Sequence, residues 1–161
     1  MLQIAILIVI LDLITKNIVV YLLKPGNPIV LIPAFFGESV GPILQLNLIR
    51  NPGAAFSLGS NSTYLLSALA IIISLYIWRT SKRIINMWWA LGLGAILGGA
   101  IGNLLDRIFR APSIFRGEVV DFLQIPYWAI FNVADMAVSI SAVVIAIMTL
   151  LGKDPFEKKV S

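Results

Sequence analysis

The sequence contains neither cysteine nor histidine among its 161 residues. Without these two residue types the chain cannot form disulfides, thiolate or histidine metal sites, a cysteine nucleophile or a Ser-His-Asp triad. Charged residues are also scarce, at 12% of the chain, against about 25% in ordinary soluble domains. Any catalysis by this chain therefore depends on carboxylates, lysine, hydroxyls or amides.

Apolar residues are in excess: they account for 59% of the chain, and the mean hydropathy is +0.95. A protein this small cannot bury so much apolar surface, so lipid is the expected solvent. Four stretches are long enough to cross a hydrocarbon core of about 30 Å. We predict one all-α membrane domain over residues 1–161, with four transmembrane helices at about residues 2–23, 60–78, 87–106 and 128–151.

The two long connections, residues 24–59 and 107–127, differ from the helices in composition. The first is rich in proline and glycine, and its segment from Leu44 to Leu48 alternates apolar and polar residues as a strand does. We therefore expect a small sheet at the membrane surface. The second mixes arginine with apolar residues, which favours a short interfacial helix or lid.

Basic residues are concentrated in two short segments. Residues 79–86 and 152–161 hold three lysines or arginines each. The positive-inside rule then places both termini in the cytoplasm and both long connections outside. The net charge of +4 follows from this topology, because the chain lacks the basic stripe with interleaved aromatics that is typical of nucleic-acid-binding proteins.

Few ionisable residues lie within the predicted spans, where each costs roughly 2.5–3.5 kcal/mol to insert, so those present are functional candidates. Asp12 and Lys16 are four residues apart in the first span. We expect them to pair along the helix, although Lys16 can also reach a carboxylate on a neighbouring helix. The other polar candidates lie toward the outer ends of the later spans: Asn103, Asp106, Arg107, Asp121, Asn132 and Asp135.

Asp135 follows Trp128 by seven residues, which puts it roughly 10 Å inside the last predicted helix. A carboxylate at that depth needs a partner. Arg107 and Lys16 are the basic candidates, and Asp121 is a second carboxylate that a folded loop can bring close. Two carboxylates in a low dielectric share one proton. Such a pair supplies the acid and the base that peptide hydrolysis requires without a metal.

Spacing alone leaves three interpretations open. The chain is an aspartyl hydrolase, a small proton- or ion-coupled transporter, or a protein whose buried ion pairs have only a structural role. Transporters usually contain internal repeats and broken helices in matching halves, and the sequence shows neither.

Five polar motifs, taken in order, narrow this choice. They are Asp12-Leu13-Ile14-Thr15-Lys16, Asn51-Pro52-Gly53-Ala54-Ala55-Phe56-Ser57, Gly98-Gly99-Ala100-Ile101-Gly102-Asn103-Leu104-Leu105-Asp106-Arg107, Val119-Val120-Asp121-Phe122 and Phe131-Asn132-Val133-Ala134-Asp135. Together they resemble the motif blocks of bacterial lipoprotein signal peptidase, also called signal peptidase II. The resemblance runs from residue 12 to residue 135, and five blocks in one order are far more specific than any single block.

The resemblance implies an aspartic endopeptidase of the bacterial cytoplasmic (inner) membrane, with its active site near the outer face. Such an enzyme removes signal peptides from prolipoproteins by cutting before a diacylglyceryl-modified cysteine, without a metal or cofactor. Family members share four helices and an extracytoplasmic β-cradle, and globomycin inhibits them by occupying the same cleft. The implied partners are a lipidated prolipoprotein and membrane lipid, for a chain expected to be a monomer with no nucleic-acid partner.

The resemblance also assigns roles to individual residues. Asp121 and Asp135 match the catalytic dyad. The residues expected to bind or position the substrate are Asn51, Gly53, Asn103, Arg107 and Asn132. Those expected to support the structure are Asp12, Lys16 and Asp106. Two departures from compact family members, the longer segment 110–116 and Met136 after Asp135, leave these assignments unchanged.

Overall fold

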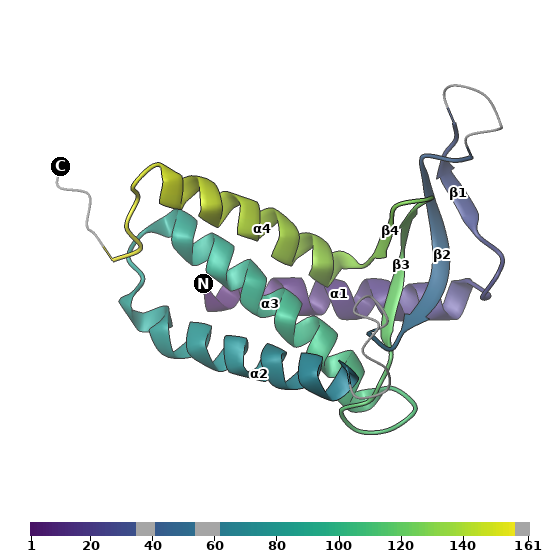
Figure 1. Ribbon diagram of the computed structural model, residues 1–161, viewed down its shortest axis with the longest axis horizontal. Coiled ribbons are helices and arrows are strands. Elements are labelled where there is room, and N and C mark those ends of the chain that lie inside the picture. Colours follow the sequence, from purple (N-terminus) through teal and green to yellow (C-terminus); the bar gives the residue numbers. More distant parts are fainter. Residues whose placement is uncertain (35–40, 54–61, 157–161) are drawn as a thin grey trace.

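Four long helices and a four-stranded sheet make up the described part of the chain (Figure 1). The computed structural model describes residues 1–34, 41–53 and 62–156. Its elements, in chain order, are α1 (Leu2–Leu22), β1 (Ile29–Ile32), β2 (Leu44–Asn51), α2 (Ser62–Thr80), the 3-10 turn η4 (Ser81–Arg83), α3 (Met87–Phe109), β3 (Val119–Ile125), β4 (Ala129–Phe131) and α4 (Val133–Leu150). Each α-helix is long and apolar enough to span a membrane, so the predicted four-helix membrane fold is confirmed.

Some predictions fall on residues that lie outside the described ranges. These are the motif residues 54–57, the expected helix start at residue 60, and Lys158 and Lys159 of the basic tail. The second helix is described from Ser62 onward.

Helix α3 packs against all three other helices. Glycines on its surface make this close packing possible. A Cβ atom on Gly98 would lie 2.7 Å from the carbonyl oxygen of Ala5 in α1, and one on Gly99 would lie 2.5 Å from the carbonyl oxygen of Ala134 in α4. Because lipid provides no hydrophobic drive between helices, such close van der Waals contact holds them together.

The sheet joins the two long connections of the sequence. Its strand order is β1-β2-β3-β4, and every neighbouring pair is antiparallel. The alternating segment from Leu44 to Leu48 lies in β2, as predicted. The second connection supplies β3 and β4, while residues 110–118 form bends and turns. The short interfacial helix expected there is therefore not formed, because the apolar part of this connection pairs with β2 instead.

An apolar cluster anchors the sheet to the end of α1. Its buried members are Val19, Leu23, Leu48, Val120 and Phe122. Strand β3 begins with four consecutive buried residues, because α1 and α3 contact a strand that already pairs with β2 and β4. Asp121, the third residue of β3, is thus fixed between the sheet and the bundle.

Helix α4 begins at Val133, five residues later than expected, because residues 129–131 pair with β3 as strand β4. Asn132 caps the helix. Its side chain accepts a hydrogen bond from the Asp135 N–H, and the Asp135 carboxylate accepts one from the Asn132 N–H. Asp135 therefore lies in the first turn, and its expected depth of roughly 10 Å inside the helix is wrong.

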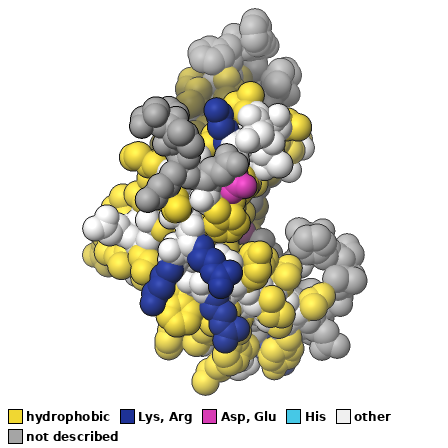
Figure 2. All heavy atoms as spheres, turned by 90° about the vertical axis from the view of Figure 1, so that its left-hand side faces the viewer, with side chains coloured by type: hydrophobic (Ala, Val, Ile, Leu, Met, Phe, Trp, Pro, Cys, Tyr) yellow, Lys and Arg dark blue, Asp and Glu magenta, His cyan; other side chains and the backbone are white. Residues whose placement is uncertain are grey.

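The two ends of the bundle differ. The start of α1, the turn η4 and the end of α4 lie at the end opposite the sheet (Figure 1). Figure 2 shows that end of the molecule, where lysine and arginine side chains gather. The exposed basic residues described in its segments are Arg79, Lys82, Arg83 and Lys153. Both long connections meet at the other end, as the sequence predicts.

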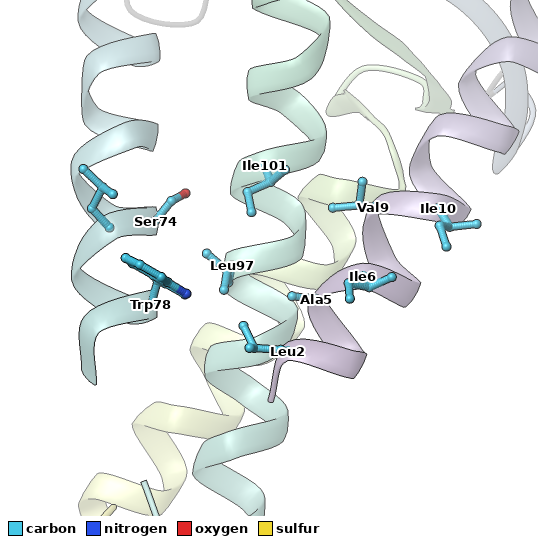
Figure 3. A pocket seen from close by; sticks show the side chains of 10 residues that line it. Leu2, Ala5, Ile6, Val9, Ile10, Ser74, Trp78, Leu97 and Ile101 are labelled. Atoms are coloured by element: carbon cyan, nitrogen blue, oxygen red, sulfur yellow. The ribbon is translucent and has the colours of Figure 1, made fainter. Parts of the chain in front are cut away.

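An apolar groove of about 470 Å³ lies between α1 and α2, alongside α3 (Figure 3). Ile6 and Val9 of α1, Trp78 of α2 and Leu97 of α3 are among its lining residues. Ser74 also lines it, and its buried hydroxyl has no hydrogen-bond partner among the described residues. All the lining residues belong to membrane-spanning helices, so the groove faces hydrocarbon rather than water.

We predict that Gly98→Ala lowers the melting temperature of the purified protein in detergent. The new methyl group would meet the backbone of α1, which cannot turn aside as a side chain can, and overpacking of this kind typically costs about 1–3 kcal/mol. Gly92→Ala on the same helix is the matched control, because its methyl group would meet first the flexible side chain of Ile145, at 3.0 Å. Equal melting temperatures for the two variants would contradict the packing role of Gly98.

Candidate active site

Asp121 lies opposite Ile49 of β2, and its side chain is buried, at 1% exposure. Two side-chain amides donate to its carboxylate. Asn51 Nδ2 donates to Oδ2 over 2.9 Å, and Asn132 Nδ2 donates to Oδ1 over 2.7 Å. Asn51 is the diagonal neighbour of Asp121 on the same face of the sheet, so the register of β2 and β3 brings the two side chains together.

Asp135 accepts its hydrogen bonds at the start of α4. Asn103 Nδ2 of α3 donates to Oδ1 over 2.8 Å, and the backbone N–H of Asn132 donates to Oδ2 over 3.2 Å. The N-terminal turn of a helix also favours a negative charge. Each of the four carboxyl oxygens of Asp121 and Asp135 therefore accepts a hydrogen bond from an amide N–H.

Asn132 connects the two carboxyl groups. It is fully buried, and its Nδ2 donates both to Asp121 Oδ1, over 2.7 Å, and to Asn103 Oδ1, over 3.1 Å. Its Oδ1 accepts from the Asp135 N–H over 2.9 Å. One buried amide thus links residues of β3, α3 and α4 that the sequence placed in one candidate site.

Gly53 contacts the site through Asn51. Its backbone φ is 100°, a conformation that side-chain-bearing residues rarely adopt, and its N–H donates to Asn51 Oδ1 over 2.8 Å. A backbone N–H can only donate, so the Asn51 oxygen faces Gly53 and its Nδ2 faces Asp121.

Arg107 is buried one turn beyond Asn103 on α3, and its charge interacts with those of Asp121 and Asp135. Arg107 is one of two basic candidates for pairing with Asp135, and no ion pair between them is among those of the described residues. Its Nη1 atom is buried and has no hydrogen-bond partner in this part of the chain. Leaving a buried donor unsatisfied costs free energy. A bound ligand that accepts a hydrogen bond from Arg107 Nη1 would therefore recover that cost.

Four charged side chains form a second group beside the site, here called the Lys16 cluster: Asp12, Lys16, Asp106 and Arg110. Lys16 Nζ lies 2.7 Å from Asp12 Oδ2 and 2.9 Å from Asp106 Oδ2. It also donates to Asn103 Oδ1 over 2.9 Å. The predicted pairing of Lys16 with Asp12 is confirmed, and the neighbouring carboxylate that Lys16 reaches is Asp106 rather than Asp135.

The Lys16 cluster also holds the segments that carry the site. Asp12 Oδ1 accepts from the Ala134 N–H over 2.9 Å, and Asp106 Oδ2 accepts from the Val120 N–H over 3.1 Å. Ala134 and Val120 are the residues that immediately precede Asp135 and Asp121. The ion pairs between α1 and α3 therefore fix the start of α4 and the start of β3.

The sequence predictions did not include Arg110 in this cluster. Arg110 pairs with Asp106 through Nε and donates to Asn17 Oδ1 over 3.3 Å. The signal was available, because residues 106 and 110 have the four-residue spacing of a helical ion pair. It was missed because the third span was expected to end at residue 106, whereas α3 continues to Phe109.

Burial raises the pKa of Asp121 to about 6, from an ordinary value of 3.8. The charge of Asp135 acts in the same direction, whereas the hydrogen bonds from Asn51 and Asn132 and the charge of Lys16 oppose it. The Asp121 carboxyl therefore binds a proton more tightly in the folded protein than in the unfolded chain.

Comparison with known proteins gives concordant results. Residues 4–151 match the model of a peptidase family described as signal peptidase II. The chain is 44% identical to the lipoprotein signal peptidase of Rhodococcus jostii, over 89% of this chain and 69% of that protein. It is 43% identical to the lipoprotein signal peptidase of Mycobacterium tuberculosis, over 96% of this chain and 72% of that protein. A bacterial membrane enzyme solved by the in meso method at 1.9 Å superposes with a TM-score of 0.76 and 28% identity, over 92% of this chain and 90% of that one.

The raised pKa of Asp121 predicts a pH dependence of stability. Well below pH 4 the carboxyl group is neutral in both the folded and the unfolded protein. Between about pH 4 and pH 6 the unfolded chain loses this proton while the buried group still holds it, so stability falls across this window and levels off above it. Asp121→Asn stays neutral. Its melting temperature in detergent, relative to the parent, should therefore rise from pH 4 to pH 7, by the equivalent of about 3 kcal/mol at most. A difference that is constant over this range would contradict the raised pKa.

Proposed function

Because the chain belongs to the signal peptidase II family, we propose that it removes signal peptides from prolipoproteins as an aspartic endopeptidase. In this proposal Asp121 and Asp135 are the catalytic dyad, and the enzyme cuts before the diacylglyceryl-modified cysteine. The observation that carries it is the pair of carboxyl groups bridged by the Asn132 amide, with a hydrogen-bond donor on each oxygen.

The dyad works through one shared proton. Burial, which raises the pKa of Asp121 to about 6, helps the pair to retain it. The ionised carboxylate takes a proton from a water molecule whose oxygen attacks the scissile carbonyl carbon, and the neutral carboxyl protonates the carbonyl oxygen. The tetrahedral gem-diol then collapses: one of its hydroxyl groups returns a proton to the ionised member of the dyad, the C–N bond breaks, and the leaving amine takes a proton from the other member. The dyad again holds one proton.

The surrounding charges fit a dyad with one negative charge. Arg107 contributes one positive charge whose field reaches both aspartates. The Lys16 cluster is neutral by itself, because its two acids pair with two bases. A fully ionised dyad would leave an uncompensated buried charge beside Arg107, which is strongly unfavourable in a low dielectric.

The same residues position the substrate and the dyad. The unused Nη1 donor of Arg107 is suited to hold a backbone carbonyl of the substrate next to the scissile bond. Asn51, held by Gly53, orients Asp121, while Asn103 and Asn132 orient Asp135. In this proposal Asp12, Lys16 and Asp106 have a structural role, because they hold the start of α4, the Asn103 amide and the start of β3.

The substrate reaches this site from the membrane. The dyad lies at the end of the bundle that carries the sheet (Figure 1), where a signal helix can pack against the bundle while the acyl chains stay in lipid. Cleavage at the end of a signal helix requires a site at this level. We further propose that the enzyme works as a monomer and that globomycin binds at the dyad, where the substrate binds.

A proton- or ion-coupled transporter is the alternative that residue spacing left open. Family membership favours the peptidase. The two functions differ in a direct measurement, because only a peptidase releases a signal peptide from a lipidated prolipoprotein in detergent, where no gradient exists.

We predict that Asp121→Asn and Asp135→Asn each abolish cleavage of a lipidated prolipoprotein by the purified protein in detergent. The carboxamide keeps the shape of the side chain but can no longer exchange the catalytic proton. Asp154→Asn is the matched control, because Asp154 is an exposed acid beyond the end of α4. Its cleavage rate should equal that of the parent, and circular dichroism should show that all three variants are folded.

Two outcomes would contradict this assignment. Retention of more than a few per cent of the activity by either dyad variant would remove that residue from the chemistry. Loss of activity in a chelator, restored by added metal, would replace the aspartic mechanism with a metal-dependent one. Globomycin should inhibit the parent in the same assay.

We also predict that both termini are cytoplasmic and that the sheet lies outside. A cysteine introduced at Ser113, between α3 and β3, should react with a membrane-impermeant thiol reagent in intact cells, and one at Ser81, in η4, should not. The dense basic residues near η4 are the physical reason. Because the chain contains no native cysteine, each signal reports one position. Permeabilised cells should label both positions, and the reverse pattern in intact cells would invert the topology.

A further inference from the structure

The orientation of the Asn103 side chain depends on Lys16. An asparagine amide can be turned either way round, and its neighbours decide which end carries the oxygen. The Lys16 ammonium can only donate, and it lies 2.9 Å from Asn103 Oδ1, where Asn132 Nδ2 also donates over 3.1 Å. With two donors on that side, Asn103 must turn its Nδ2 toward Asp135 Oδ1, which it reaches over 2.8 Å.

Asn51 and Asn132 are oriented in a similar way, but by the main chain. Asn51 Oδ1 accepts from the Gly53 N–H, and Asn132 Oδ1 accepts from the Asp135 N–H. These backbone donors persist whatever side chain is present. At Asn103 the corresponding charged donor is the side chain of Lys16, which a substitution can remove.

Lys16 is itself enclosed by acceptors. Its side chain is fully buried, and an ammonium group has three donor hydrogens. Three acceptors surround it: Asp12 Oδ2 at 2.7 Å, and Asp106 Oδ2 and Asn103 Oδ1 at 2.9 Å each. Two of the donors therefore go to ion pairs, and the third is aimed at the amide that contacts Asp135.

We propose that Lys16 is a positioning residue of the active site, which orients the Asn103 amide so that Asp135 always faces a hydrogen-bond donor. The proposal rests on the proposed function, since it gives Lys16 a part in presenting Asp135 to a hydrogen-bond donor as a member of the dyad. Without the ammonium, only the longer hydrogen bond from Asn132 Nδ2, over 3.1 Å, still holds the Asn103 oxygen on that side, so the amide turns its oxygen toward Asp135 more readily. Two facing oxygens repel each other or trap the catalytic proton between them.

Charge balance and positioning are separable, because they involve different partners of Lys16. Lys16→Met removes both, leaves Asp12 and Asp106 with excess negative charge, and is expected to lower stability. Adding Asp12→Asn restores neutrality, because Asp106 keeps Arg110 and an asparagine oxygen at position 12 can still accept from the Ala134 N–H. The compensated double variant is thus expected to recover stability without recovering the donor to Asn103.

The experiment compares two compensated variants of equal charge. Asp12→Asn/Lys16→Met has no donor at position 16, whereas Asp12→Asn/Lys16→Gln carries an amide N–H there. Prolipoprotein cleavage is measured in detergent, well below both melting temperatures. We expect the kcat of the methionine variant to fall about 10–100-fold with KM within about twofold, and the glutamine variant to regain most of the lost kcat. Gly94→Ala, whose methyl group would meet the Met1 carbonyl oxygen about 13 Å along α3 from Asn103, should keep the parental kcat.

A double-mutant cycle with Asn103→Ala tests the route of the effect. If Lys16 acts through Asn103, adding Lys16→Met to Asn103→Ala in the Asp12→Asn background lowers kcat no further. If instead the kcat losses caused by Lys16→Met and by Asn103→Ala multiply in the combined variant, the proposal is overturned. It would also be overturned if the compensated methionine variant kept its kcat within about threefold of the Asp12→Asn parent, since Lys16 would then only balance charge.

A second measurement needs no substrate. In protein labelled with ¹⁵N-asparagine, the side-chain amide signals of Asn103, assigned by their loss in Asn103→Ala, should exchange slowly in the parent and in the glutamine variant but rapidly in the methionine variant. If the Asn103 signals behave in this way but the parent protein does not cleave prolipoprotein, the proposed function is refuted and the orienting role of Lys16 remains intact. Unchanged Asn103 signals in the methionine variant of a cleaving enzyme would refute the orienting role alone.

Discussion

The buried ammonium of Lys16 is the interaction on which the rest of this structure depends. A charge without partners among apolar helices costs several kcal/mol, so it must be surrounded by acceptors. Asp12 and Asp106 fulfil this role and join α1 to α3. Their remaining acceptor capacity is used by the N–H groups of Ala134 and Val120, which fix the start of α4 and of β3. The two site carboxylates follow directly in the chain.

The four spans can be predicted because hydropathy is a property of long segments, and tertiary contacts do little to change it. Short elements are different. Residues 129–131 are apolar and continue into α4, so composition alone does not distinguish strand from helix there; pairing with β3 decides it. The Asn132 and Asp135 capping pair marks the true helix start in the sequence, but the apolar run before it gives a competing signal. The pairing of β2 with β3 joins segments that are distant in the chain, so no local sequence pattern predicts which two strands are neighbours.

The members of the candidate site can be predicted more readily than their contacts. Asp12 and Lys16 are recognisable as a pair because their spacing places them on one helical face. The contact between Lys16 and Asn103 spans 87 positions of the chain, so only the folded bundle reveals it. The orientation of each asparagine amide is harder still to predict from the sequence, because it depends on which neighbouring groups can only donate a hydrogen bond. That orientation decides whether a carboxylate meets a donor or another oxygen.

Strand β1, at the edge of the described sheet, exposes all four of its apolar side chains, Ile29 to Ile32. Transfer of such side chains from water into acyl chains is favourable by roughly 25 cal/mol per Å², so the sheet is drawn toward the lipid. Strand β3 stands two strands further in, where Asp106 holds the Val120 N–H and Asn132 joins Asp121 to the start of α4. The edge that contacts lipid and the strand that carries Asp121 are thus different parts of one sheet, so the apolar rim sets the height of the sheet in the membrane while the buried polar contacts set the position of the carboxyl group.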